Sequence, residues 1–138
     1  MSGLARFSVS VEEELLKALD TFVAAKGYPT RSEAVKHLVR NALVETMWKA
    51  KGTVAGVIVM AYDHHKRDVV RKLLEVQHDH SDVIISTQHV HLDHDNCMET
   101  ITVRGRAGRI KKLESAIRSL KGLKHSDLMV TAGGRAVP

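Results

Sequence analysis

The chain has 138 residues, a hydrophobic fraction of 43% and a formal net charge of +5 at pH 7. This length allows one domain or two small ones, and the mildly basic charge permits nucleic-acid binding without proving it. Aromatic residues make up only 4% of the chain, which argues against single-strand recognition by base stacking. No apolar run reaches the length of a membrane span and no signal segment opens the chain, so we expect no membrane association. The single cysteine, Cys97, cannot form an internal disulfide, which fits a reducing cytoplasm.

The chain begins with a short alternating segment over residues 4–11. Successive side chains of a strand point to opposite faces, so this segment has one apolar and one polar face. The apolar face carries Phe7, Val9 and Val11, and the polar face carries Arg6, Ser8 and Ser10. A short strand without a hairpin partner is not stable alone. We therefore expect it to pair with the same strand of a second copy, which gives a two-fold dimer joined by an antiparallel ribbon.

Two helices are predicted to follow this strand. Ser10–Glu13 and Thr30–Glu33 both have the pattern of a capping box, in which a hydroxyl side chain caps the helix and a glutamate follows three positions later. Gly27 is expected to end the first helix in a left-handed conformation, and the second helix is expected to run to about Ala50. Residues 1–51 are too few to form a hydrophobic core of their own, so two intertwined copies would complete this domain.

The polar face of the expected ribbon is a candidate for base recognition. A two-stranded ribbon fits the major groove of DNA. Arg6 can bond guanine through two hydrogen bonds, and the hydroxyls of Ser8 and Ser10 can reach donors or acceptors on base edges. An ordinary solvent-exposed face is the alternative. The coupled strand–helix–helix pattern favours DNA binding over that alternative.

Residues 52–132 are expected to form a second domain. Its strands are predicted over 53–62, 83–92, 97–104 and 125–131, and its helices over 65–77 and 109–121. The first strand is almost entirely apolar, so we expect both of its faces to be buried, and we expect a loop at 105–108. The order β-α-β-β-α-β is the ferredoxin-like arrangement, which makes the chain an α+β protein. Residues 133–138 are expected to be a flexible tail.

The hairpin of this second domain carries the candidate metal ligands. His89 and His91 are two positions apart in a predicted strand, so both side chains lie on one face. The polar turn 93–96 then brings Cys97 back beside His91. Thiolate and imidazole ligands suit Zn, Cu, Co or Ni: a tetrahedral set would favour zinc, and a planar one nickel or copper. A fourth ligand must come from elsewhere, and the nearest candidates are His78 and His80; His80 and His94, each in a polar run, are individually expected to be solvated.

Several segments together resemble the nickel-responsive transcriptional regulators of the NikR family. The N-terminal segments are Arg-Phe-Ser-Val-Ser-Val at 6–11 and Gly-Tyr-Pro-Thr-Arg-Ser-Glu-Ala at 27–34, typical of a ribbon-helix-helix module. The C-terminal ones are Asp-His-His-Lys-Arg-Asp at 63–68, Gln77-His78 and the set of His89, His91 and Cys97. The resemblance covers nearly the whole chain, and the metal motif is its most specific part.

This resemblance implies a nickel site and an assembly. His89, His91 and Cys97 of one subunit, with His78 of another, would hold Ni(II) in a square plane, one ion per subunit. Glu99 would lie just outside the ligands, as a hydrogen-bonding residue. Relatives of this kind work as homotetramers, in which two ribbon dimers flank four ferredoxin-like domains of the ACT type.

The resemblance also implies how DNA is bound. Arg6, Ser8 and Ser10 would read a palindromic operator in double-stranded DNA. Arg31, Lys66 and Arg67 would contact the DNA backbone, and nickel would strengthen binding and repress nickel uptake. One departure from the family pattern is His37. It occupies a position where relatives carry an acidic residue that binds a secondary cation together with a residue matching Glu33, so a hard-cation site is doubtful here.

Three alternatives remain for the function. The same architecture could sense zinc, cobalt or copper. A small-molecule-sensing module is the second, because ACT-type domains often bind small effectors, although the His/Cys cluster is unnecessary for that role. An enzyme is the third, and it is not expected: Glu99 is the only nearby carboxylate that could act as an acid or base.

Overall fold

The computed structural model describes residues 3–49 and 52–133. By contact the chain divides into two compact units, one up to Val39 and one from Arg40. Lys51, the expected boundary, lies outside the described residues, as does all of the expected tail except Gly133. None of the described helices combines the length and the apolar character needed to cross a membrane.

The N-terminal unit has an extended arm followed by helices. Residues 3–12 form no strand within the single chain, and helix α1 (Glu13–Lys26) and the start of helix α2 (Arg31–Lys49) follow. The expected capping box at Ser10 is wrong: extended backbone continues to Glu12, which precedes the first turn without a side-chain cap, so the Ser10 hydroxyl lies outside that turn. The other two signals are confirmed. Gly27 has φ 73° at the end of α1, and the Thr30 hydroxyl accepts a 3.1 Å hydrogen bond from the Glu33 N–H.

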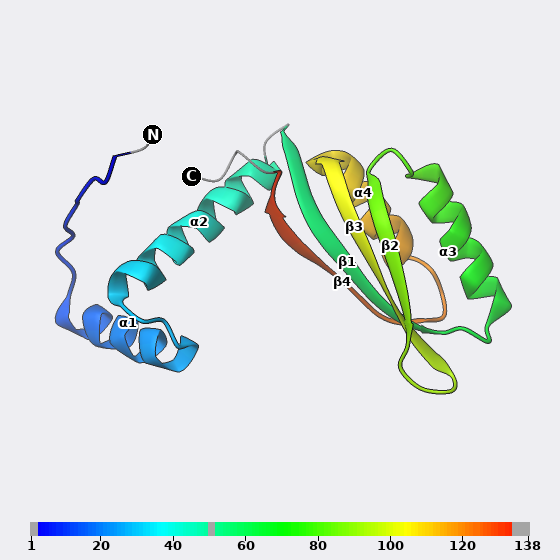
Figure 1. Ribbon diagram of the computed structural model, residues 1–138, viewed down its shortest axis with the longest axis horizontal. Helices are drawn as coiled ribbons and strands as arrows, with labels where there is room; N and C mark the ends of the chain where they lie inside the picture. Colours follow the sequence, from blue (N-terminus) through cyan, green and yellow to red (C-terminus); the bar gives the residue numbers. More distant parts are fainter. Residues whose placement is uncertain (1–2, 50–51, 134–138) are drawn as a thin grey trace. The chain divides into compact units, whose positions relative to one another are not determined.

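The C-terminal unit contains a four-stranded antiparallel sheet in the order β2-β3-β1-β4 (Figure 1). Its elements in chain order are β1 (Thr53–Asp63), α3 (Arg67–Asp79), β2 (Ile84–His91), β3 (Asn96–Arg106), α4 (Ala107–Arg118) and β4 (Leu123–Ala132). This order is ferredoxin-like, so the predicted α+β fold is confirmed. The loop expected at 105–108 is wrong, because β3 runs directly into α4. Gly105 allows the close approach there, since a Cβ on it would lie 2.7 Å from Val83 Cγ1.

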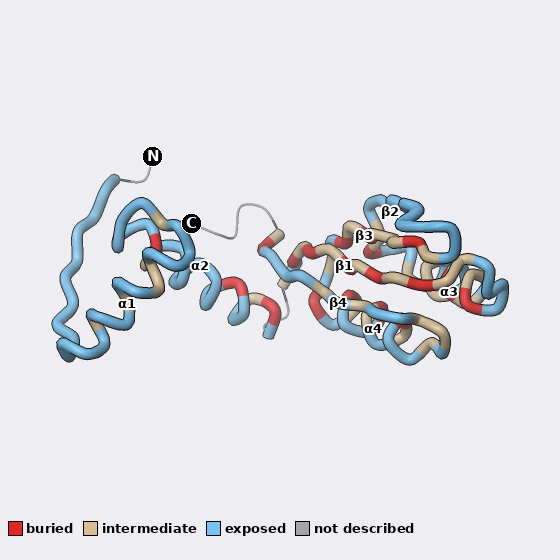
Figure 2. Tube along the Cα trace, turned by 90° about the horizontal axis from the view of Figure 1, so that it is seen from below, coloured by how far each residue is buried: buried red, intermediate tan, exposed pale blue. Residues whose placement is uncertain are grey.

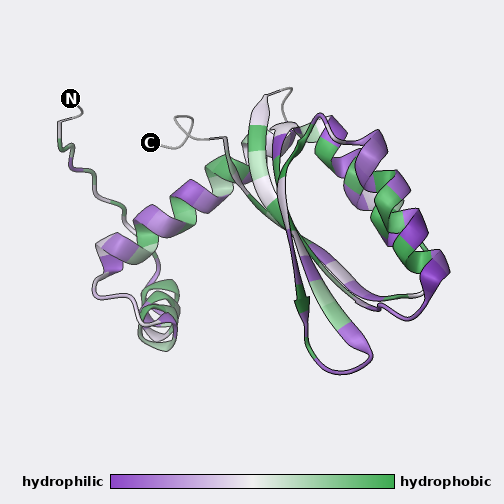
Figure 3. Cartoon of the chain, turned by 45° about the vertical axis from the view of Figure 1, so that its right-hand side comes forward, coloured by the Kyte–Doolittle hydropathy of each residue, from purple (hydrophilic) through white to green (hydrophobic). Residues whose placement is uncertain are grey.

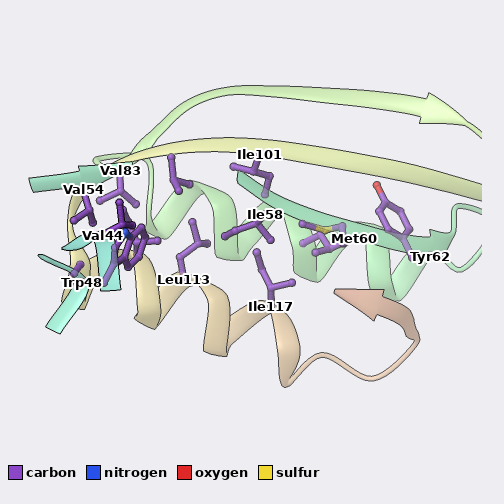
Figure 4. Packing of buried hydrophobic residues seen from close by; sticks show 14 of the residues in the cluster. Val44, Trp48, Val54, Ile58, Met60, Tyr62, Val83, Ile101, Leu113 and Ile117 are labelled. Atoms are coloured by element: carbon purple, nitrogen blue, oxygen red, sulfur yellow. The ribbon is translucent and has the colours of Figure 1, made fainter. Parts of the chain in front are cut away.

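The hydrophobic core lies between the sheet and its two helices (Figure 4). The sheet contributes Ile58, Met60 and Ile101, α3 contributes Leu73, and α4 contributes Ile110, Leu113 and Ile117, all fully buried. β1 does not have two buried faces, as expected from its apolar sequence. Its residues alternate between buried and half-buried, because in the single chain the helices cover only one face of the sheet (Figure 2).

The second half of α2 packs with the C-terminal unit. Val44 and Trp48 are buried in the same core as the sheet residues. The indole Nε1 of Trp48 donates a 2.8 Å hydrogen bond to the carbonyl oxygen of Thr131 on β4. A buried indole N–H needs such an acceptor, so this bond fixes the end of α2 on the edge strand β4.

Candidate metal centre and nucleic-acid interface

The register of β2 and β3 places the predicted metal ligands on one face of the sheet. His91 pairs with Cys97 and His89 pairs with Glu99. Directly opposite residues of neighbouring strands share a face. Cys97 in turn pairs with Tyr62, which is buried toward the helices. The side chains of His89, His91, Cys97 and Glu99 therefore all lie on the face of the sheet that the helices cover. The rings of His89 and His91 stack with centroids 5.4 Å apart.

Cys97 is fully buried at the start of β3. Its Sγ donates a hydrogen bond of 3.5 Å to the carbonyl oxygen of Tyr62. Burial raises the pKa of the Cys97 thiol, and the negative charges of Glu99 and Asp63 raise it further. The thiol form is therefore favoured unless a cation binds beside the sulfur. In the part of the chain that the structure describes, the ligand atoms of His89, His91 and Cys97 do not all lie within 4.8 Å of one another.

The remaining predicted ligand, His78, lies on α3. It is exposed in the last turn of that helix and forms no metal-ligand cluster with the other three predicted ligands among the described residues. Its neighbour Gln77 is connected to the site, because the Gln77 side-chain amide donates a 2.7 Å hydrogen bond to the Glu99 carboxylate. The end of α3 and the ligand-bearing hairpin are thus joined by one direct contact.

His64 is a candidate ligand that the sequence reasoning missed. Its ring centroid lies 4.8 Å from that of His91 and 4.2 Å from that of His65. The Nδ1 atom of His64 is buried without a hydrogen-bond partner among the described residues. Burial lowers the pKa of His64, and the neighbouring imidazoles of His65 and His91 lower it further. A buried, unpartnered nitrogen beside two imidazoles fits a borderline divalent metal ion.

The signal for His64 was present in the sequence but depended on a long-range register. His64 directly follows β1, whose last residue Asp63 pairs with Asn96 at the start of β3. The His64 N–H also donates a 3.2 Å hydrogen bond to the Asp95 carbonyl oxygen. Only this pairing places His64 beside the histidines of the hairpin.

The predicted base-contacting residues lie on the N-terminal arm. Arg6, Ser8 and Ser10 are all exposed in the extended segment. The apolar residues that alternate with them are also uncovered in the single chain, with Phe7 76% and Val9 67% exposed. The arm therefore presents both a polar row and an unburied apolar row.

The predicted backbone-contacting residues differ in their surroundings. The Arg31 guanidinium donates hydrogen bonds of 2.7 and 2.8 Å to the two carboxylate oxygens of Asp20, a pairing that raises the pKa of Arg31 and lowers that of Asp20. Lys66 and Arg67 lie at the start of α3, are exposed, and form no side-chain ion pair within the described chain. These two cations are available to phosphates.

The residues of the doubtful secondary cation site have other partners in the structure. The Glu33 carboxylate forms an ion pair with Lys36, one turn along α2. The His37 ring packs edge-on against Tyr28, with centroids 5.5 Å apart. Both contacts lie within the N-terminal unit.

An extended arm followed by two helices, joined to a ferredoxin-like domain that carries a His/Cys cluster, defines the class of metal-dependent DNA-binding regulators. Residues 5–46 match the model of the ribbon-helix-helix proteins of the copG family. Residues 55–131 match the model of the NikR C-terminal nickel-binding domain. These two matches together span both units of the chain.

Curated relatives are similar over their full length. The chain is 52% identical over 132 residues to a protein of Chlorobaculum parvum, with 96% of this chain and 98% of the relative covered. It is 47% identical over 133 residues to a protein of Thermococcus onnurineus, with 96% of each covered. The names of both relatives contain the words nickel-responsive regulator. The chain belongs to this NikR family of transcriptional regulators, which are not enzymes.

A solved structure is similar in fold alone. An uncharacterized protein from Thermotoga maritima superposes with a TM-score of 0.52 at 10% sequence identity, covering 57% of this chain and 98% of its own. This likeness fits the common occurrence of the ferredoxin-like arrangement and says nothing about metal or DNA.

Proposed function

We propose that this protein is a Ni(II)-responsive regulator whose nickel-bound form binds a palindromic operator more tightly and represses the genes of nickel uptake. The observation that carries this function is the pairing of His91 with Cys97, next to His89 on the same face. Two imidazoles and a thiol on one face are a ligand set for a borderline or soft cation. A DNA-binding regulator of this kind would work in the cytoplasm.

His89, His91 and Cys97 would hold one Ni(II) per subunit together with His78 from a second copy. His78 is exposed and belongs to no ligand cluster among the described residues, as expected for a residue that completes a site elsewhere. Bound nickel would supply a positive charge beside Cys97, and that charge favours the thiolate that burial disfavours. The residues of this chain position the donors and exclude water from the sulfur.

Helix α3 would couple nickel to DNA. Lys66 and Arg67 lie at its start and His78 in its last turn, so metal binding at one end can restrain the cations at the other. The hydrogen bond from Gln77 to Glu99 holds the metal-side end against β3. Once ordered, the positively charged side chains of Lys66 and Arg67 would strengthen contact with DNA phosphates independently of base sequence. The size of this effect is limited by the difference in nickel affinity between the two arrangements.

Residues 1–51 would recognise DNA as a dimer. The exposed apolar row of Phe7, Val9 and Val11 would be covered when two arms pair, and the paired ribbon would present Arg6, Ser8 and Ser10 to the major groove. Residues 52–132 would bind metal and join two such dimers into a homotetramer. Such a two-fold assembly accounts for a palindromic operator.

The test combines absorption spectroscopy with DNA binding by the full-length protein. We expect Ni(II) to produce a thiolate charge-transfer band and planar d–d bands at one equivalent per subunit, and to tighten binding to the operator. Cys97→Ser should lose the charge-transfer band and the nickel response while keeping basal DNA binding. Parallel titrations with zinc, cobalt and copper identify the activating metal. Equal operator affinity with and without nickel would refute the function.

A further inference from the structure

The ferredoxin-like domain has a cavity at the end of the sheet where β1 begins and β3 ends. Thr53 and Arg106 pair across these two strands, and the cavity lies between the end of α2 and the start of α4. The turn of the β2–β3 hairpin lies at the opposite end of the sheet (Figure 3). The cavity has a volume of about 420 Å³, which is within the usual range for small-molecule sites.

The lining of this cavity is strongly basic. Among the described residues no carboxylate lines it, whereas five cationic side chains do: Lys49, Arg106, Arg109, Lys111 and Lys112. The Arg109 guanidinium is neutralised by hydrogen bonds of 3.0 and 2.6 Å to the Asp82 carboxylate. The other four are exposed and form no ion pair within the described chain. Unpaired like charges around one cavity repel each other, and a bound anion would remove that repulsion.

The backbone at the start of α4 adds to this positive potential. The first turn of α4 contains no acidic residue, and no side chain caps it. The Ala107 N–H donates a 3.4 Å hydrogen bond to the Gly52 carbonyl oxygen, but the N–H of Gly108, which also lines the cavity, has no acceptor among the described residues. A Cβ on Gly108 would meet no atom within 4 Å, so the backbone there is open to a ligand. Unpaired N–H groups and the helix dipole favour an anion at this position.

We propose that this cavity binds a small anion with two or more phosphate groups, either inorganic pyrophosphate or an organic diphosphate. A guanidinium, ammonium groups and a helix N-terminus are the donors that phosphate oxygens prefer. Four unpaired cations match more than one phosphate group, and the buried residues Trp48 and Ala107 give the cavity an apolar wall. A concave site of this volume suits a compact anion better than a DNA duplex.

The cavity is separate from the other candidate sites of this domain. Lys66 and Arg67 follow the far end of β1, whose 11 residues span about 33 Å at the usual rise of a strand. Lys49 is the last residue of α2, so an anion held between Lys49 and the start of α4 would restrain the end of that helix. It would add to the hydrogen bond from Trp48 to the Thr131 carbonyl oxygen. None of these contacts involves a predicted nickel ligand.

Calorimetry on the full-length protein, without added metal, tests this site with pyrophosphate and with adenosine 5′-diphosphate in separate titrations. We expect one anion per subunit, and the tighter of the two identifies the source of the phosphates. Arg106→Gln and Lys112→Gln should each weaken binding about tenfold, because each removes charge-assisted hydrogen bonds. Lys121→Gln replaces an exposed cation beyond the other end of α4 and is the matched control. The fluorescence of Trp48, the only tryptophan, provides a second readout at the cavity.

Two results would overturn the anion site. If neither anion binds at millimolar concentration, the cavity is an ordinary solvated surface, or part of the DNA interface where Arg106→Gln also lowers operator affinity. If Arg106→Gln and Lys121→Gln weaken binding equally, the anion responds only to the net charge of the protein. Because the titrations contain no nickel, their outcome is independent of whether the proposed nickel response is found. Circular dichroism on each variant checks that these exposed substitutions leave the fold intact.

Discussion

The side-chain amide of Gln77 on α3 donates a 2.7 Å hydrogen bond to the carboxylate of Glu99 on β3. Glu99 lies directly opposite His89, and Gln77 is adjacent to His78 in the sequence. One contact therefore joins the helix that carries one predicted ligand to the strands that carry the other three. A carboxylate in this position can orient neighbouring imidazoles without binding the metal itself.

Replacing Glu99 by alanine should lower nickel affinity more than it lowers stability. Loss of a residue that orients metal ligands typically reduces metal affinity by about 10- to 100-fold, whereas one lost hydrogen bond costs about 1 kcal/mol of folding free energy. Competition with a chelator of known affinity measures the first effect and urea unfolding the second. Glu75→Ala removes an exposed carboxylate of α3 that pairs with Arg71, and it should leave nickel affinity unchanged. Equal nickel affinity in Glu99→Ala and the unchanged protein would exclude the orienting role.

The shared face of His89 and His91 could be predicted from the sequence because it depends only on the two-residue period of a strand. The order of elements could also be predicted, since each helix and strand has its own local pattern. The full burial of Cys97 and the contact between Gln77 and Glu99 could not, because both arise from packing of α3 and β1 against β3. Such contacts join residues far apart in the chain.

Three inferences from the sequence failed for the same reason, because each used a local pattern alone. The apolar sequence of β1 suggested burial on both faces, but burial depends on how many layers cover the sheet, which the strand does not encode. The serine at position 10 matched a capping pattern, but the extended arm continues past it to Glu12. His64 was overlooked as a candidate ligand because only the register between β1 and β3 brings it to the hairpin. Local patterns specify elements, and the register between elements specifies the site.

Replacing a buried leucine by alanine should lower the free energy of unfolding far more than replacing an exposed one. Leu113 on α4 is fully buried, whereas Leu74 on α3 is 64% exposed. Leu113→Ala should reduce the free energy of unfolding of the ferredoxin-like domain by about 2–5 kcal/mol, because it removes packed atoms and leaves a cavity. Leu74→Ala should change it by about 0.5 kcal/mol or less. Urea unfolding of both variants provides the comparison. Similar losses for the two leucines would mean that the core between the sheet and α4 is misassigned.

The ion pair between Asp82 and Arg109 should make stability depend on acid pH. The Arg109 guanidinium donates hydrogen bonds of 3.0 and 2.6 Å to the Asp82 carboxylate, and these hydrogen bonds lower the pKa of Asp82. A carboxyl with a lowered pKa in the folded state stabilises the protein above its unfolded pKa of about 3.9, and this contribution disappears as pH falls through the folded value. Asp82→Asn should therefore be less stable than the unchanged protein at pH 6. The difference should shrink below about pH 4, and urea unfolding at both pH values would detect it. A difference that does not change with pH would show that the Asp82 charge contributes nothing.

Replacing Arg6 by alanine should relax base choice in the operator. Arg6 is exposed on the extended arm and alternates with apolar residues in the same way as Ser8 and Ser10. A bidentate arginine–guanine contact contributes about 1–3 kcal/mol of discrimination. Fluorescence anisotropy with the operator and with single-base variants should show affinity lost for the operator and little further loss for one substituted position. Lys17→Ala, on the exposed side of α1 beside Glu13, is the control for charge alone. If Arg6→Ala weakens binding to all sequences by the same factor, Arg6 contacts phosphate and not a base.

Replacing Lys66 by alanine should weaken DNA binding without changing base preference, in contrast to the Arg6 replacement. Lys66 immediately precedes α3, is exposed, and forms no ion pair within the described chain. A phosphate contact is independent of sequence and releases counterions, so its loss should weaken all DNA sequences alike and reduce the slope of log K against log salt by about 1. The change should be larger with nickel than without it if, as proposed, bound metal restrains the helix that follows Lys66. Measurements at several salt concentrations, with and without nickel, separate these effects. Lys121→Ala, between α4 and β4, provides the matched control. An unchanged salt slope, or an equal loss of affinity in both metal states, would separate Lys66 from the nickel response.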